Sequence, residues 1–149
     1  MTRFQSEQGD IARKFLQSHS LMSLSYVGPE QKPHSAVVEY VMTDDGEILF
    51  STFKDKRKYE WLRQNSAVSI VVGWTFDENI TIQYEGTAEE LCGTDHLRYS
   101  DYYFHILPDA EKFADAFSHL GKLAFFKVSP KWVRYSDFNQ TPWEITEFE

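Results

Sequence analysis

Short runs of β-branched and aromatic residues recur along the chain, and turn-forming residues separate them. Within the first run, Met22, Leu24 and Tyr26 alternate with serines, which is typical of a half-buried strand. Similar runs follow at short intervals. We predict about seven strands, covering residues 21–26, 34–42, 47–53, 67–76, 80–88, 122–128 and 131–135.

Turn signals indicate how some of these strands pair. The sequence Thr-Asp-Asp-Gly at residues 43–46 predicts an antiparallel hairpin between the strands on either side of it. Ser129 and Pro130 predict a last hairpin, because proline interrupts the hydrogen bonding of a strand. The nearly continuous apolar run at residues 67–76 predicts a buried central strand.

Helical patterns lie between the strands. Apolar residues at helical spacing predict an amphipathic helix within residues 4–19, a two-turn helix near residues 58–64 and another over residues 94–105. A helix over residues 108–120 has proline at its start and Gly121 just past its end. We therefore predict an α+β fold, an antiparallel barrel with short capping helices.

Composition narrows the function classes. At 149 residues we expect a single domain, residues 1–149. The formal net charge of −8 disfavours nucleic-acid binding. No apolar run is long enough for a membrane span, and Cys92, the single cysteine, excludes an intramolecular disulfide. We expect a cytoplasmic protein that binds neither nucleic acid nor membrane.

Common catalytic and metal motifs do not occur in the sequence. The five histidines show no HxH or HExxH spacing, so we expect no metal site and surface positions for them. GxSxG, Walker and GxGxxG motifs are also missing, which excludes the serine hydrolases, P-loop proteins and Rossmann folds that depend on them. Haem stays an alternative, because it needs only one axial histidine.

A basic cluster at residues 54–58, Lys-Asp-Lys-Arg-Lys, is the sharpest chemical feature of this acidic chain. It can be a solvated turn. However, it also opens a predicted helix, whose N-terminus favours anions, so cations there are unfavourable unless a bound anion compensates. Arginine and lysine both bind phosphate, and the hydroxyls of Ser51 and Thr52 are near in sequence. The pattern therefore predicts a phosphate site.

The segment Phe50–Lys58 (FSTFKDKRK), followed by Leu62, Asn65 and residues 67–70, resembles the signature of FMN-binding split barrels related to pyridoxamine 5′-phosphate oxidase. Weaker resemblance extends from residue 35 to residue 135. It implies an antiparallel split β-barrel and a homodimer with two FMN sites at its interface. Members of that family also bind deazaflavin or haem, or no cofactor.

The resemblance also implies which residues bind the cofactor. Ser51 and Thr52 match residues on the phosphate side of the flavin, and Arg57 and Lys58 match the phosphate ligands. Lys56 stands where the oxidase commonly has serine. The strand from Ser35 lines the ring through its backbone, and Gln83 lies near ring contacts from the partner subunit. The expected cofactor-binding residues are Ser35, Val37, Val38, Ser51, Thr52, Lys56, Arg57, Lys58 and Gln83.

The sequence departs from the oxidase near its C-terminus. Residues 133–139 (VRYSDFN) have no histidine, although the oxidase has an Arg-x-His-type motif there, so oxidation of pyridoxamine phosphate is not expected. We predict an FMN-dependent oxidoreductase that uses a small-molecule substrate or electron donor, with no assignable catalytic residue. The alternatives are a non-catalytic haem or flavin carrier and an interaction module.

Two aromatic groups have a structural and a ligand-binding interpretation. The run Tyr99, Tyr102, Tyr103 and Phe104 favours a core or dimer contact over a ligand wall. Trp132, Arg134, Tyr135 and Trp143 favour a closing strand and a docked tail over a flavin wall.

Overall fold

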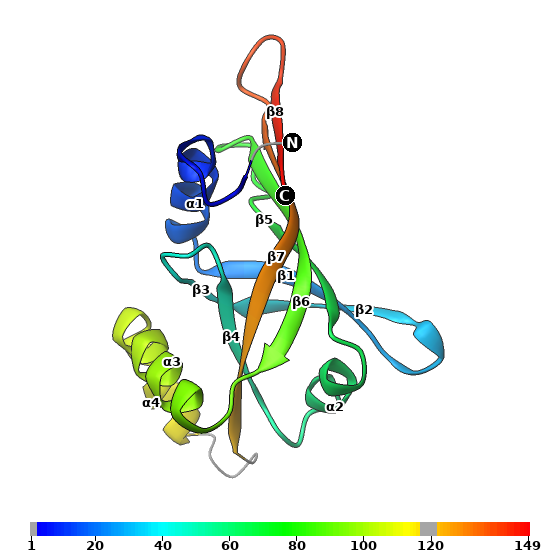
Figure 1. The fold of residues 1–149 in the computed structure, drawn as a ribbon, viewed down its shortest axis with the longest axis vertical. Coiled ribbons are helices and arrows are strands. Elements are labelled where there is room, and N and C mark those ends of the chain that lie inside the picture. The colour runs from blue at the N-terminus through cyan, green and yellow to red at the C-terminus, as the bar shows by residue number, and fades with distance from the viewer. Residues whose placement is uncertain (1–2, 117–121) are drawn as a thin grey trace.

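The structure, a computed structural model, describes residues 3–116 and 122–149. It combines one antiparallel sheet with several short helices (Figure 1). The elements in chain order are η1 (Glu7–Gly9), α1 (Asp10–Gln17), β1 (Leu21–Val27), η2 (Pro29–Gln31), β2 (Pro33–Glu39), β3 (Val41–Met42), β4 (Ile48–Phe53), α2 (Arg57–Gln64), β5 (Ala67–Val72), β6 (Ile80–Glu90), α3 (Gly93–Ile106), α4 (Pro108–Ala116), β7 (Leu123–Asp137) and β8 (Glu144–Phe148).

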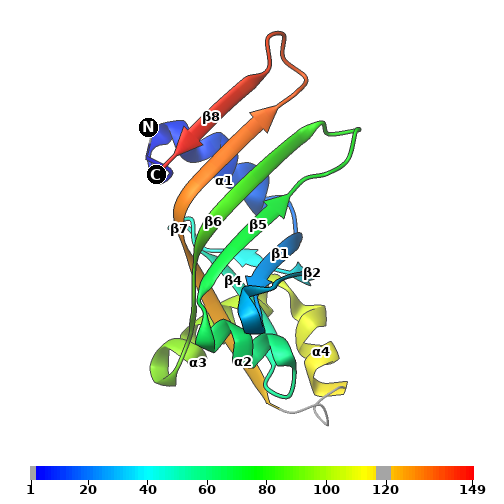
Figure 2. The same cartoon turned by 90° about the vertical axis from the view of Figure 1, so that its right-hand side faces the viewer.

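The sheet has eight strands, with β2-β1-β5-β6-β7-β4-β3 as its hydrogen-bonded path and β8 added to β7. Strand β7 connects its two halves. Residues 123–128 pair with β4, residues 133–137 pair with β8, and β6 runs beside both parts. The sheet curls around a main apolar core (Figure 2), so the predicted α+β split barrel is confirmed.

The predicted strand at residues 34–42 is divided in two. Strand β2 pairs with β1, whereas β3 pairs with β4 through the turn at residues 43–46. Tyr40 marks the break, because its backbone N–H donates to Ser20 O (2.9 Å) and its hydroxyl donates to Leu16 O (2.5 Å). Only the short β3 therefore forms the predicted hairpin, and β2 becomes an edge of the sheet.

The predicted hairpin at Ser129 and Pro130 is wrong, because both residues lie inside the continuous strand β7. A register shift opposite Glu85 and Gly86 accommodates the proline, as bulges commonly do. At residue 86 a Cβ atom would lie only 2.2 Å from Ser129 O, so the close approach of the two strands requires glycine. Strand β8, which is not predicted, places Phe148 in the core against Phe4.

The helices occupy different sides of the sheet. Helix α1 contributes Ala12 and Leu16 to the main core. Figures 1 and 2 place α2 and the α3–α4 pair at the same end of the molecule, with β4 between them in Figure 1. A second apolar cluster lies under α3. The helix predicted over residues 108–120 is present to Ala116, and the remaining residues lie outside the described part of the chain.

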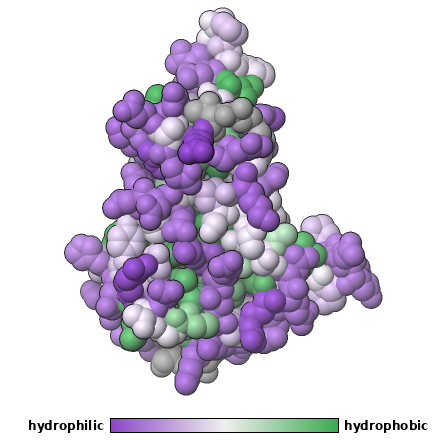
Figure 3. Space-filling view, in the orientation of Figure 1, coloured by the Kyte–Doolittle hydropathy of each residue, from purple (hydrophilic) through white to green (hydrophobic). Residues whose placement is uncertain are grey.

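The surface is mostly hydrophilic in the view of Figure 3, with a hydrophobic area between α3 and the lower end of β7. In the described parts of the chain, none of the helices has the length and apolar character needed to cross a bilayer. Residues 3–116 and 122–149 also contain no group of three histidine, cysteine or acidic side chains arranged for a metal ion.

Candidate functional site

A cavity of about 360 Å³ lies between β2, β4 and the α3–α4 pair. Val37 and Val38 form one wall, and residues 51–53 form the opposite wall. Tyr103 of α3 and several residues of α4 cover the space between these walls. Small-molecule sites usually have volumes of about 300–1,000 Å³, so this cavity is large enough for a ring system.

Backbone groups contribute to this cavity because β2 is an edge strand of the sheet. An edge strand presents unpaired N–H and C=O groups on its free side. Val37 is 66% exposed and Val38 is half-buried on the other face, yet both line the cavity. The strand edge therefore faces the cavity, and it can hydrogen-bond a flat heterocycle with donors and acceptors along its rim.

Strand β4 supplies two hydroxyl groups from opposite faces. Phe50 and Thr52 lie on the face of the main core, whereas Leu49 and Ser51 lie on the face toward α3. Only 7% of Thr52 is exposed. The alternation of β4 therefore brings a serine hydroxyl to the α3 side of the cavity.

The basic cluster follows β4 directly and leads into α2. Lys56 occupies the N-cap position without a side-chain cap hydrogen bond. The Tyr59 N–H donates to Lys56 O (3.1 Å), and the N–H groups of Arg57 and Lys58 precede the first carbonyl that the helix can offer them. Within the described residues, Lys54, Lys56, Arg57 and Lys58 have no carboxylate within ion-pair distance. Four uncompensated cations beside a helix N-terminus form an anion-binding surface.

Aromatic rings, rather than carboxylates, lie beside three of these cations, Lys54, Arg57 and Lys58. The Arg57 guanidinium lies 4.9 Å from the centre of the Trp61 ring, and Lys58 Nζ lies 5.9 Å from that of Tyr26. Burial lowers the pKa of Lys58, because desolvation disfavours the charged ammonium. A bound anion would favour the charged form and offset this effect.

His34 belongs to the same aromatic group and is half-buried, a more packed position than the predicted surface histidine. Its ring lies 4.6 Å from that of Trp61 and 5.8 Å from that of Tyr26. The imidazole fits closely, because a Cβ atom at Gly28 would lie 2.7 Å from His34 Nε2. This packing ties β2 to α2, which carries the cations.

Strand β2 connects the cation cluster with the cavity. His34 lies at the cluster and Val38 at the cavity, about 13 Å apart at roughly 3.3 Å per residue. On the opposite side, β4 passes from the cavity through the basic turn into α2. The same two segments therefore border a ring-sized cavity and an anion-binding surface.

The nine predicted cofactor residues fall into three groups. Four line the cavity, namely Val37, Val38, Ser51 and Thr52. Three open α2, namely Lys56, Arg57 and Lys58. The remaining two, Ser35 and Gln83, lie on the exposed outer face of the sheet.

Ser35 and Gln83 do not line this cavity in the described structure. The Ser35 hydroxyl bonds the Ser25 hydroxyl at 2.9 Å. Gln83 lies in register with Val71, three strands away from Val37, or about 14 Å at the usual strand spacing. A role for Gln83 in a cofactor site therefore requires a second chain, as the resemblance implies, and it stays a prediction.

Tyr103 belongs to the aromatic run for which the sequence favours a core or dimer contact over a ligand wall. Its side chain is only 2% exposed and forms part of the second apolar cluster, which confirms the predicted core contact, but it also lines the cavity. Burial raises the pKa of Tyr103 to about 12, although a hydrogen bond from Ser51 acts in the opposite direction. Helical spacing alone does not show which tyrosine of the run faces a cavity.

The C-terminal aromatic residues form a closing strand pair. Arg134 lies 5.1 Å from the Trp132 ring and pairs with Glu147 of β8. Trp143 packs against Phe138 with ring centres 4.9 Å apart. None of these five residues is in the described lining of the cavity.

Comparisons with known proteins agree with this architecture. The sequence model of the family described as "Pyridoxamine 5′-phosphate oxidase" matches residues 10–137. No curated protein matches the chain. The family match spans β1 to β7, and so includes both the cavity and the basic turn.

Solved structures with a similar fold differ in what their names describe. An FAD-binding protein from Mesorhizobium loti aligns with a TM-score of 0.68 and 21% identity, over 84% of this chain and 89% of that one. A heme binding protein from Mycobacterium smegmatis aligns with a TM-score of 0.73 and 15% identity, over 95% of this chain and 58% of that one. The third structure is a protein from Clostridium acetobutylicum that is related to general stress protein 26, of the pyridoxinephosphate oxidase family. It aligns with a TM-score of 0.71 and 14% identity, over 98% of this chain and 94% of that one.

Proposed function

Because the chain belongs to the pyridoxamine 5′-phosphate oxidase family, we propose that it is an FMN-dependent oxidoreductase. The flavin ring lies in the cavity between β2, β4 and α3–α4, and the phosphate lies at the N-terminus of α2. One observation carries the proposal: a ring-sized cavity and four cations with no carboxylate partner among the described residues lie along the same two segments.

The residues of the site fit both ends of this cofactor. The free edge of β2 at Val37 and Val38 offers backbone groups to the polar rim of a flat ring. Arg57 offers a planar fork for two phosphate oxygens, Lys58 offers a compact charge, and the N-terminus of α2 offers N–H groups. Ser51 and Thr52 add hydroxyl groups between the two ends.

The bound flavin supplies the hydride or electron transfer. The protein binds and orients it: the cations fix the phosphate, and β2 and β4 fix the ring. The α3–α4 pair covers the cavity and limits the access of water to it. A small-molecule electron donor or substrate completes the reaction, and pyridoxamine phosphate is not that substrate.

A haem or flavin carrier is the second candidate, and the similarity to a heme binding protein favours it. The described lining of the cavity has no histidine, cysteine or methionine, which are the common axial ligands of haem iron. This lining favours a flavin. A deazaflavin with the same phosphate group fits the cation cluster equally well.

The protein acts as a homodimer in this proposal. Ser35, Ser25 and Ser69 form a cross-strand row on the exposed outer face of β2, β1 and β5. Small side chains leave this face open, with a hollow lined by Ser25 and Ser69, so a second copy can pack on it and bring Gln83 to the partner's cofactor. Cys92, an exposed free cysteine, fits the reducing cytoplasm.

The visible spectrum of the purified protein, followed by identification of the ligand released on heating, tests the cofactor. We expect FMN at about one per chain. In the double variant Arg57→Ala/Lys58→Ala, the flavin is lost on purification while the fold is retained, because both phosphate cations are gone.

The control Lys14→Ala/Lys112→Ala removes the same charge from exposed positions on α1 and α4, and it should keep the flavin. A cation-cluster variant that purified with full flavin would disprove the phosphate assignment. A Soret band in the wild-type spectrum would instead support the haem carrier.

A further inference from the structure

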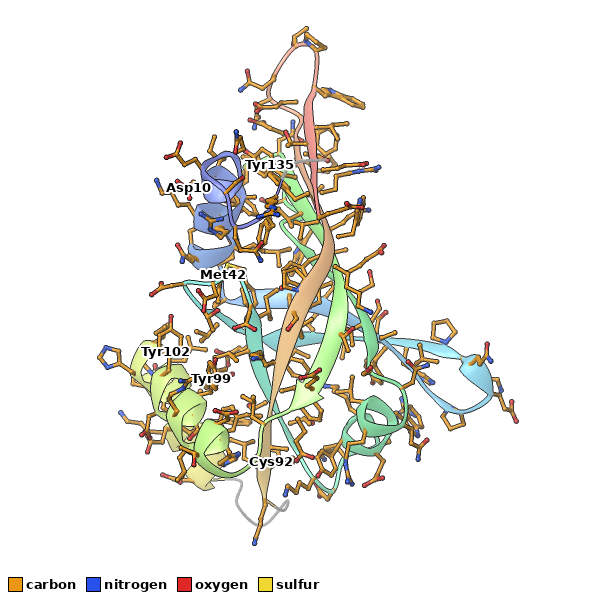
Figure 4. The ribbon with its side chains drawn as sticks, in the orientation of Figure 1. Asp10, Met42, Cys92, Tyr99, Tyr102 and Tyr135 are labelled. Carbon is orange, nitrogen blue, oxygen red and sulfur yellow. The ribbon has the colours of Figure 1, made fainter. Side chains whose placement is uncertain are left out.

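Three tyrosines of α3 place their hydroxyl groups in different surroundings. Tyr102 donates to Met42 O (3.1 Å), and Tyr99 accepts from Arg98 Nη2 (2.9 Å). Figure 4 labels both of these tyrosines on α3, with Tyr102 near Met42. Of the three, only Tyr103 is in the described lining of the ring cavity, where it lies opposite β2.

Packing fixes the ring of Tyr103. It meets Phe125 of β7 edge-on at 5.3 Å and Phe104 at 5.6 Å. Phe125 is itself in edge contact with His96 and Phe104. The phenol is therefore held in one position before any ligand arrives, which reduces the entropy cost of a hydrogen bond to that ligand.

The hydroxyl of Tyr103 is arranged to donate. Burial raises its pKa to about 12, so it keeps its proton at neutral pH. Ser51 acts to lower this pKa, and the Glu39 carboxylate on the cavity wall acts to raise it. A protonated phenol in the cavity lining can donate to an acceptor on a bound ring.

We propose that Tyr103 is a ring-binding residue that donates a hydrogen bond to a carbonyl oxygen of the bound flavin, with Ser51 as its positioning partner. This inference rests on the proposed function. It assigns the polar edge of the ring to the α3 side of the cavity. It also places Tyr103, which belongs to the α3–α4 pair and not to the barrel strands, in direct contact with the cofactor.

The proposal also explains why the cavity has mixed walls. Ala110, Phe113 and Ala114 give the α4 side an apolar surface, whereas Ser51, Tyr103 and Glu39 give polar groups. A flavin has a dimethylbenzene edge and a pyrimidine edge with carbonyl groups. The apolar residues suit the first edge. The hydroxyl donors Ser51 and Tyr103 suit the carbonyl groups of the second edge, and the Glu39 carboxylate can accept from its ring N–H.

Titrations of the apoprotein with FMN and with riboflavin, followed by quenching of flavin fluorescence, test this assignment. Tyr103→Phe should weaken the binding of both ligands by the same factor, about threefold to tenfold, since it removes one hydrogen bond to the ring. Arg57→Gln should weaken only FMN, because riboflavin has no phosphate. Tyr102→Phe is the matched control and should change neither affinity.

Ser51→Ala is the second variant, and it should weaken both ligands less than Tyr103→Phe does. The two Tyr→Phe variants keep the aromatic ring, and Ser51→Ala changes only a hydroxyl on β4. Circular dichroism checks that each variant is folded. Equal affinities of wild type and Tyr103→Phe for both flavins would overturn the assignment and leave the proposed function intact. Wild-type protein that binds neither flavin would overturn the proposed function itself.

Discussion

Lys58 shows how a binding residue can reduce the stability of the protein that carries it. Lys58 is half-buried, and its ammonium lies beside Tyr26. Within residues 3–116 and 122–149, no carboxylate lies within ion-pair distance of it. Desolvation lowers its pKa, so the folded apoprotein disfavours the charged form. Binding sites often retain such unfavourable residues because the ligand compensates for them.

We expect Lys58→Met to stabilise the apoprotein at neutral pH and to weaken FMN binding. Below the lowered pKa of Lys58, its charge is unfavourable in the folded state. As pH rises from that pKa toward the usual lysine pKa of 10.5, the unfolded state binds more protons, so the wild type gains stability relative to the variant. Urea unfolding between pH 7 and pH 10 measures this difference.

The control for this prediction is Lys54→Met, at an exposed lysine of the same cluster, and it should give a difference that does not depend on pH. A Lys58→Met protein less stable than the wild type at pH 7 would contradict the prediction. That result would mean that the contact between Lys58 and Tyr26 outweighs the cost of burying the charge.

Single residues were predictable where local chemistry determines their role. The four cations at residues 54–58 stand out in the sequence, and the structure places them at a helix N-terminus as predicted. The positions of His34 and Tyr103 could not be predicted, because they depend on neighbours far away in the chain. Trp61 packs on His34, and Tyr103 shares a cavity lining with Ser51.

Among the secondary-structure elements, helix α2 has an unusual N-terminus. Its N-cap residue is Lys56, which makes no side-chain cap, although serine, threonine, aspartate and asparagine are strongly preferred there. The exposed N–H groups stay available to a ligand. The helix therefore gives up local stability at the end where the proposed phosphate binds.

Lys56→Ser should stabilise the apoprotein by about 1 kcal/mol, because a serine N-cap satisfies one of these N–H groups. Lys54→Ser, which lies before the cap, should have no such effect. Urea unfolding of both variants in the absence of flavin makes the comparison. Equal stability of the two variants would show that water or another group already satisfies the helix end.

Strand β7 shows why element boundaries are harder to predict than element types. Proline at residue 130 indicates a chain break, yet the strand continues through it for 15 residues. Its neighbour decides the outcome: Gly86 of β6 allows the backbone of β7 to approach closely, and the register shift beside Gly86 leaves Lys131, next to the proline, without a partner on β6. The sequence of β7 alone does not contain this information.

At the scale of the whole molecule, the outer face of the sheet links the assembly of two chains to the predicted cofactor site. The cavity and the cation cluster lie within one chain, but the predicted residue Gln83 lies about 14 Å from Val37 on this outer face. A second chain packed on this face would unite the two parts of the predicted site. Assembly and cofactor binding are therefore linked in the proposed function.

We expect the wild type to be a dimer and Ser69→Arg to be a monomer that loses FMN. Ser69 is the β5 end of the serine row, and a long cation there prevents close contact of the two outer faces. Light scattering with size-exclusion chromatography measures the mass. Lys112→Glu on α4 is the control and should stay dimeric, and a wild-type mass of one chain would refute the proposed assembly.

The sequence by itself determined the strand-rich α+β fold, most helices and the basic turn at residues 54–58, because alternation, turn residues and local charge are short-range properties. Tertiary structure decided the rest. It made β2 a free edge, joined two predicted strands into β7 opposite Gly86, and brought Tyr103 of α3 to Ser51 of β4. These outcomes depend on contacts between residues distant in the chain, which no local pattern specifies.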